Sequence, residues 1–111
     1  MRLNKVDFLL SLAAKAGRIV SGQTKVLDAV RSGKACLCIV TGDASDNTKK
    51  RLADKCSFYE IPLYIYGTSE QTGHVIGKDI RSCVALTDPG LAGQIKLKLE
   101  EMSVDGENED I

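Results

Sequence analysis

The feature that most constrains the fold is an uninterrupted apolar run, ACLCIVT, at residues 35–41. A strand with one face in water alternates apolar and polar residues, whereas a strand covered on both faces is apolar throughout. Seven residues are also far too few to cross a bilayer. The run therefore predicts a central strand with helices packed on both of its faces.

Further strands alternate with helices along the rest of the chain. Strands are expected at 18–20, 35–41, 62–66 and 82–87, and helices are expected to begin near residues 4, 22, 45, 69 and 88. Asn4 and Asp88–Pro89 are residue types that start helices, and Gly17 and Gly33 are typical of their ends. This alternation predicts an α/β protein, a three-layer α/β/α sandwich with a mixed four-stranded sheet.

The charges divide the chain of 111 residues into a basic body and an acidic end. Residues 1–98 contain all 15 Lys and Arg and nine Asp and Glu, a net charge of +6, and residues 99–111 carry −6. We expect one domain over 1–102 and a flexible acidic tail over 103–111. A basic body suits a polyanionic partner, although a solvated charged surface would have the same composition.

Neither a signal peptide nor a membrane-spanning stretch is evident in the sequence. We therefore expect a cytoplasmic, monomeric protein with no membrane partner.

Four cysteines are present, and a strand would place Cys36 and Cys38 on the same side of the sheet. Zinc binding by Cys36, Cys38, Cys56 and Cys83 is the weaker interpretation, because the spacing is C-x-C and His74 is the one histidine. Reduced thiols that pack as small apolar side chains are the stronger one. No metal site and no cofactor is expected.

The sequence contains no complete motif for catalysis or nucleotide binding. G-x-S-x-G and G-x-G-x-x-G are absent, and the stretch IGKD at 76–79 has Thr72 and Asp79 where a phosphate-binding loop needs Gly and Ser or Thr. We therefore expect no catalytic residues and no enzymatic activity.

The helix start at residues 21–25 is the best candidate for an anion-binding surface. Backbone N–H groups at a helix start lack partners, and the helix dipole favours negative charge there. Gln23 and Thr24 can contact bases, and Lys25 can contact a phosphate. Gly22 either allows close approach of a nucleic-acid backbone or simply makes a tight turn from strand to helix, while Gly33 ends the helix.

Two stretches, VSGQTKVLDAVRSGKACLCIVTGDASDNTKKRLADKCSFYEIPLYIY and GHVIGKDIRSCVALTDPGLAGQI, resemble a known family. They are similar to the kink-turn-binding ribosomal protein superfamily (the ribosomal L-seven-Ae and L-thirty-e group), most closely its short bacterial members, over about residues 4–100. The resemblance implies an α/β/α sandwich that binds RNA through the helix start at 21–28 and a loop at 77–83.

Individual positions depart from the family pattern. Gly22 matches the family's glycine, but Thr24, Lys25 and Asp28 occupy the places of an Asn-Glu-x-x-Lys signature, and Asp28 would repel a phosphate. Residues 80–83 correspond to the loop that covers unstacked bases. The candidate RNA-binding residues are Gly22, Gln23, Thr24, Lys25, Asp28, Lys34, Lys78, Ile80, Arg81, Ser82 and Cys83.

The sequence thus predicts a non-enzymatic, ribosomal-protein-like RNA-binding protein. Its expected partner is structured ribosomal or regulatory RNA, with kink-turn RNA as the specific candidate and the ribosome as a candidate setting. The alternative is a protein–protein interaction module of the translation machinery, which would dock through the basic helix that begins near residue 45.

Overall fold

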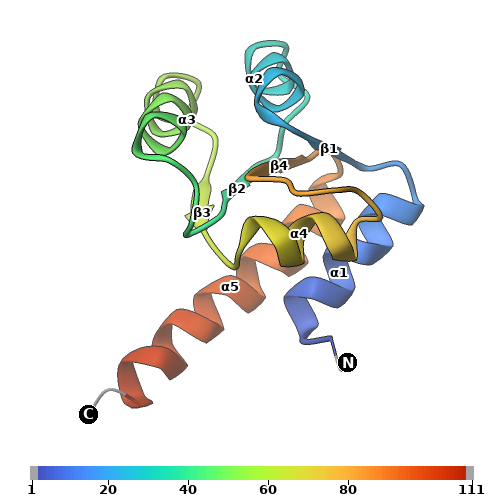
Figure 1. The fold of residues 1–111 in the computed structure, drawn as a ribbon, viewed down its shortest axis with the longest axis vertical. Helices are drawn as coiled ribbons and strands as arrows, with labels where there is room; N and C mark the ends of the chain where they lie inside the picture. Colours follow the sequence, from blue (N-terminus) through green and yellow to red (C-terminus); the bar gives the residue numbers. More distant parts are fainter. Residues whose placement is uncertain (1–2, 110–111) are drawn as a thin grey trace.

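The computed structural model describes the backbone of residues 3–109 and the side chains of residues 3–102. Helices and strands alternate as expected, and Figure 1 shows their arrangement. The elements are α1 (Lys5–Lys15), β1 (Ile19–Ser21), α2 (Gln23–Arg31), β2 (Leu37–Val40), α3 (Asp46–Phe58), β3 (Leu63–Ile65), α4 (Ser69–Val75), β4 (Cys83–Leu86) and α5 (Pro89–Glu109).

The four strands form one mixed sheet in the order β1-β4-β2-β3. β4 is antiparallel to both β1 and β2, while β3 is parallel to β2. In Figure 1, α2 and α3 cover one face of the sheet, and α1, α4 and α5 cover the other. The predicted three-layer α/β/α sandwich is confirmed.

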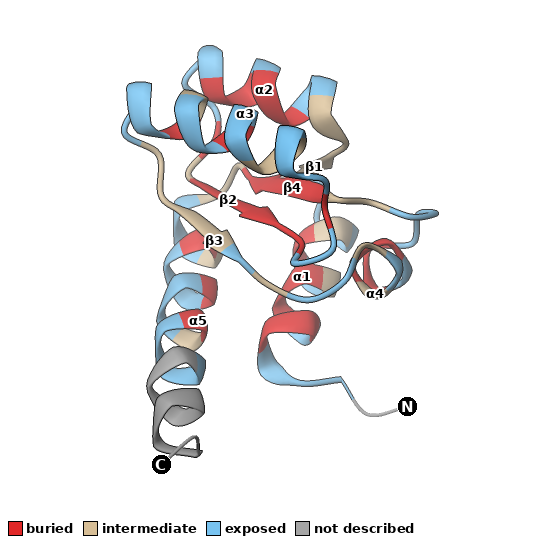
Figure 2. Ribbon diagram, turned by 60° about the vertical axis from the view of Figure 1, so that its left-hand side comes forward, coloured by how far each residue is buried: buried red, intermediate tan, exposed pale blue. Residues whose placement is uncertain are grey.

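Every residue of the two central strands, β2 and β4, is buried, as Figure 2 shows. Their side chains alternate between two cores. Leu37 and Ile39 pack with α1 and α5, whereas Cys38 and Val40 pack with α2 and α3. Burial of a large apolar side chain contributes about 1.5–3 kcal/mol, so a continuous apolar run is stable only between two layers of helices.

One expectation about the cysteines is wrong. Cys36 packs against the core on the α1 and α5 side, while Cys38 belongs to the opposite core. The regular strand begins only at Leu37, so the two-residue period does not extend back to Cys36. All four cysteines are free thiols, and no three His, Cys, Asp or Glu side chains within residues 3–102 are grouped as metal ligands would be.

Side chains cap four of the helices where the sequence predicts helix starts. Asn4, Ser45, Thr68 and Asp88 each accept a hydrogen bond from a first-turn backbone N–H. α2 differs, because its capping residue is Gly22, which has no side chain to accept one. Its first-turn N–H groups are therefore left without a cap.

The C-terminal helix α5 extends to Glu109. The predicted flexible acidic tail, 103–111, falls outside the residues whose side chains are described. Within the described chain, no helix combines the length and the apolar character needed to cross a membrane.

Candidate RNA-binding groove

Pairing of β1 with β4 brings two distant segments together. Ser21 lies opposite Val84 in the register of the sheet, and the backbone N–H of Gly22 donates to the carbonyl of Cys83 at 3.1 Å. The start of α2 therefore lies beside the loop that precedes β4. Arg81 and Ser21, separated by 60 residues in sequence, are in direct contact.

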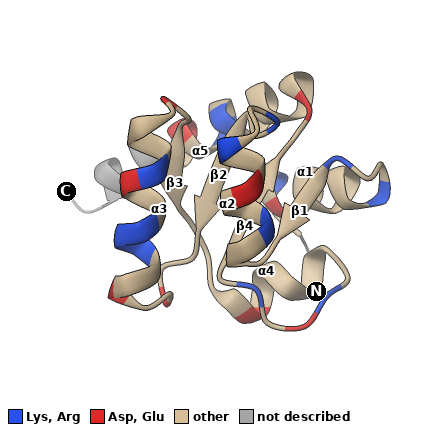
Figure 3. Ribbon diagram, turned by 90° about the horizontal axis from the view of Figure 1, so that it is seen from above, with Lys and Arg blue, Asp and Glu red and all other residues tan. Residues whose placement is uncertain are grey.

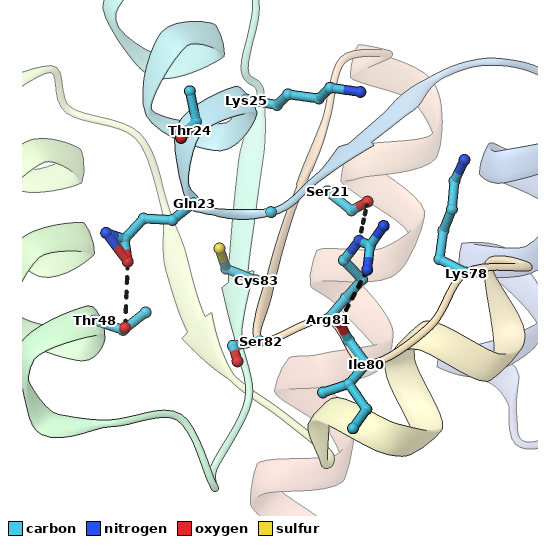
Figure 4. A pocket seen from close by; sticks show the side chains of 11 residues that line it. Ser21, Gln23, Thr24, Lys25, Thr48, Lys78, Ile80, Arg81, Ser82 and Cys83 are labelled. Carbon is cyan, nitrogen blue, oxygen red and sulfur yellow. Dashed lines mark hydrogen bonds between the residues drawn. The ribbon is translucent and has the colours of Figure 1, made fainter.

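A groove with a volume of about 480 Å³ lies between these two segments (Figure 4). Nine of the eleven predicted residues line it. The lining residues are Ser21, Gly22, Gln23, Thr24, Lys25, Thr48, Lys78, Ile80, Arg81, Ser82 and Cys83. Three of these are cations and none is an acid, so all the charged side chains that line the groove are positive.

One side of the groove, the α2 wall, consists of residues 21–25. Gly22 has φ +92° and ψ +148°, a conformation that is essentially restricted to glycine. The tight strand-to-helix turn predicted for Gly22 is thus confirmed, while close approach of RNA at Gly22 stays a prediction. A Cβ at Gly22 would have no atom within 4 Å, so the space above this turn is open.

Uncapped backbone N–H groups at residues 23–25 add a positive dipole end to the α2 wall. The Gln23 side chain is held by Thr48, whose hydroxyl donates to Gln23 Oε1 at 3.3 Å. Ser45, the cap of α3, donates in turn to Thr48 Oγ1 at 3.0 Å. Thr48 was not among the candidates, because its contact with Gln23 depends on α2 and α3 lying side by side.

The opposite side, the loop wall, consists of Lys78 and residues 80–83. Arg81 Nε donates to Ser21 Oγ at 3.1 Å, and Arg81 Nη1 donates to the Ile80 carbonyl at 3.0 Å. The guanidinium group therefore bridges the two walls, as Figure 4 shows. Ile80 is 65% exposed, an apolar side chain in an otherwise polar groove.

Cys83 lies at the bottom of the groove and is only 2% exposed. Burial, together with the nearby Cys56, raises the pKa of the Cys83 thiol to about 11. The thiol is therefore neutral at physiological pH and adds no charge to the groove.

The loop wall is held in place from behind by α4. A Cβ at Gly73 would lie 1.5 Å from the Asp79 carbonyl oxygen and 3.3 Å from the Arg81 nitrogen, so only glycine allows the loop to lie against the helix. The Arg81 N–H also donates to the Ser69 carbonyl at 3.0 Å. These contacts set the position of the Arg81 backbone.

Asp43, in the loop after β2, fastens the start of α4. Its carboxylate accepts hydrogen bonds from the Ser69 backbone N–H at 2.9 Å and from the Ser69 hydroxyl at 2.8 Å. The hydroxyls of Thr41 and Ser69 beside this carboxylate lower the pKa of Asp43. Asp43 therefore supports the loop wall through Ser69.

Two predicted residues, Asp28 and Lys34, do not line the groove. Asp28 forms an ion pair with Arg31 on the exposed face of α2. Lys34 follows Gly33, which has φ +78°, at the far end of the same helix. Contacts of Asp28 and Lys34 with a larger ligand that extends beyond the groove remain predictions.

Basic residues also lie on α3, which packs beside α2 (Figure 3). Lys49 Nζ donates to the Gly42 carbonyl at 2.7 Å, and Lys50 pairs with Asp54 at 3.4 Å. These two cations are thus partly engaged within the protein, as Arg81 is in the groove.

Comparison with known proteins identifies related sequences and structures. The family model of the ribosomal protein L7Ae/L30e/S12e/Gadd45 family matches residues 4–95. RNA-binding protein YlxQ of Bacillus subtilis (strain 168) is 40% identical over 87 residues, which is 78% of this chain and 87% of that protein. The alignment covers most of both chains.

Two solved structures share the fold. A protein of unknown function from Bacillus halodurans superposes with a TM-score of 0.82 at 36% identity, over 84% of this chain and 94% of that chain. The 15.5kD RNA binding protein of Giardia lamblia superposes with a TM-score of 0.74 at 20% identity, over 91% and 92%.

Proposed function

The chain belongs to the ribosomal protein L7Ae/L30e/S12e/Gadd45 family, and we propose that it is a non-enzymatic protein that binds structured RNA in the groove between the α2 wall and the loop wall. The observation that carries the proposal is the composition of this groove. Lys25, Lys78 and Arg81 line it without any carboxylate, next to the uncapped start of α2. YlxQ, the bacterial relative, is itself described as an RNA-binding protein.

Phosphates would be held by these three cations and by the first-turn N–H groups of α2. Gln23 and Thr24 would then face base edges, with Gln23 already oriented by Thr48. Ile80 offers an exposed apolar surface for an unstacked base. Such an arrangement suits an RNA that is bent and has bases outside the helical stack.

Kink-turn RNA is the specific ligand that we propose. A protein with two walls around an open groove would capture a bent conformation that the RNA already samples. Asp28 departs from the family signature, but its ion pair with Arg31 reduces the repulsion that a phosphate would meet there.

The test is a titration of the full chain with a kink-turn RNA and with a straight duplex of the same base composition, at several salt concentrations. We expect tighter binding of the kink-turn and a plot of log K against log salt whose slope is about −0.9 per phosphate contact. Equal affinities would contradict kink-turn recognition. Binding without salt dependence would contradict the proposed groove.

Substitutions in the two walls locate the site. Arg81→Ala and Lys25→Ala should each weaken binding and reduce the salt slope by about 1. Lys15→Ala, at the end of α1 outside the groove, is the matched loss of one cation and should leave both quantities unchanged. Equal effects of all three substitutions would indicate nonspecific attraction by net charge.

A further inference from the structure

A second surface of the molecule is apolar and shares no residue with the RNA-binding groove. Nine large apolar side chains are exposed among the described residues, and five of them lie on α1, on α5 or directly before α1. These five are Leu3, Phe8, Leu12, Leu97 and Met102. Single exposed apolar residues are ordinary, but a cluster of this kind is typical of an interaction site.

The α1 and α5 helices do not need these side chains for their own packing. α1 packs on the sheet through a different set, which includes Val6 and Leu10, and α5 does so through Ile95. Phe8 and Leu12 lie one turn apart on α1 and are 50% and 39% exposed. The fold is therefore complete without them.

Three of these side chains, Phe8, Leu12 and Leu97, border a concave site, which we call the α1/α5 groove. Its volume is about 410 Å³, and its lining residues are Lys5, Phe8, Leu9, Leu12, Gln94, Leu97 and Lys98. Apolar residues from both helices form most of the lining. An apolar groove between two helices can receive the apolar face of an amphipathic helix of another protein.

Charge at the α1/α5 groove indicates the chemistry of its partner. Lys5 and Lys98 are the two charged lining residues, and the lining contains no acid. Lys98 Nζ lies 3.2 Å from Glu101 Oε2, in an ion pair whose side chains are 35% and 49% exposed. Such an exposed pair contributes little, so Lys98 can exchange this contact for a carboxylate of a partner.

We propose that the α1/α5 groove binds one helix of a partner protein, with its apolar face on Phe8, Leu12 and Leu97 and its Asp or Glu side chains facing Lys5 and Lys98. A second copy of this chain fits less well, because a symmetric contact through the same surface would bring the lysines of both copies together. The RNA-binding groove would stay open in such a complex. The protein would then join a structured RNA to a protein partner.

The sequence suggested protein interaction as an alternative function and assigned it to the basic helix that is now α3. The exposed apolar residues of the α1/α5 groove favour a different surface. The inference does not depend on RNA binding, and each can fail without the other.

The test begins with a display library of 18-residue helical peptides that have a fixed leucine face and random residues beside it. The full chain is used to select from this library. We expect the retained peptides to be enriched in Asp and Glu next to the leucine face. Retained peptides that are neutral or basic, or no retained peptide at all, would overturn the proposal.

Variants then locate the bound peptide, with affinity followed by fluorescence anisotropy. Phe8→Ser and Leu97→Ser should each weaken binding at least tenfold, whereas Phe58→Ser, at a residue 77% exposed on α3, should have no effect. The double variant Lys5→Glu/Lys98→Glu should prefer a peptide whose acids are replaced by lysines. Lys50→Glu, the charge control on α3, should not change the preference.

Two further measurements distinguish other occupants. RNA titration should be unchanged for all of these variants, which separates this inference from the RNA-binding proposal. Sedimentation should show a monomer. A wild-type dimer that Leu97→Ser dissociates would show that the groove is a contact between two copies and would overturn the proposal.

Discussion

The two walls of the candidate RNA-binding groove both require glycine, but for different physical reasons. Gly22 in the α2 wall has φ +92°, and a Cβ there would meet no atom within 4 Å. Gly73, behind the loop wall, lies within the helix α4, but its Cβ would lie 1.5 Å from the Asp79 carbonyl oxygen. The α2 wall thus depends on local backbone conformation, and the loop wall depends on packing between distant segments.

This difference determines how each wall can be damaged. The positive φ at Gly22 is a property of the backbone between Ser21 and the first turn of α2. The loop wall depends on Gly73, Ser69 and Asp43, which contact no ligand in the proposed complex. Substitutions outside the groove should therefore impair the loop wall more easily than the α2 wall.

The largest effect is expected for Gly73→Ala. The new methyl group collides with backbone atoms, so the loop with Lys78 and Arg81 must shift, at a cost of about 1–3 kcal/mol in the free energy of unfolding. RNA affinity should fall at least tenfold, as measured by titration alongside thermal unfolding. Gly93→Ala in α5, where a Cβ meets nothing within 4 Å, is the control and should not destabilise the protein.

Wild-type RNA affinity in Gly73→Ala would show that the loop wall does not determine binding, and the contrast between the walls would then be irrelevant to function.

The next effect in size is expected for Gly22→Ala, which strains the backbone by about 1–3 kcal/mol without a collision. RNA affinity should fall, but by less than in Gly73→Ala, because the strand-to-helix turn can adjust locally. Gly33→Ala, with φ +78° at the far end of α2, should also lower stability yet leave RNA affinity unchanged. Equal losses of affinity at Gly22 and Gly33 would point to general destabilisation.

A smaller effect is expected for Asp43→Asn, which weakens the attachment of Ser69. The pKa of Asp43 is lowered in the folded protein below its ordinary value of 3.8, so the ionised carboxylate stabilises the fold at pH values above that value. That contribution is lost as the pH falls through the lowered pKa. The difference in unfolding midpoint between wild type and Asp43→Asn should therefore be constant near neutral pH and shrink in acid.

Asp54→Asn, in an exposed ion pair on α3, is the control for this pH series. If the Asp43→Asn difference stayed constant down to pH 3, the loop wall would not depend on the ionised carboxylate.

The smallest effect is expected for Asp28→Lys, which should strengthen RNA binding on the α2 side of the groove. It replaces an acid with the cation of the family signature, and RNA affinity should rise about twofold to fivefold at low salt and less at high salt. Asp54→Lys on α3 makes the same change in net charge. A similar gain in both variants would mean that the position on α2 is unimportant.

Most of the fold could be predicted from local patterns. The apolar run at 35–41 predicted a doubly covered strand, now β2 (Leu37–Val40), and Asn4 predicted the start of α1. The faces of Cys36 and Cys38 were wrong because the strand is shorter than the apolar run. Hydrophobicity shows that a segment is buried, but it does not show where regular backbone geometry begins.

Groove residues that belong to a sequence motif could be predicted. Residues that reach the groove only through contacts between distant segments were missed. Residues 22–25 and the loop before β4 were both candidates, and pairing of β1 with β4 brings them together. Thr48 was missed because it reaches Gln23 across two helices. The packing that requires Gly73 depends on Asp79 lying against α4, and no sequence motif marks that contact.

Ser21 pairs with β4, so the two walls of the groove can come together only after β4 has been synthesised. A nascent chain that has emerged only as far as α3 contains the α2 wall but lacks the loop wall. A chain of that length therefore cannot form the groove. Closure of so long a loop in the chain must precede the contact between Arg81 and Ser21. Competence for the proposed RNA binding would therefore arise only after β4 has been synthesised.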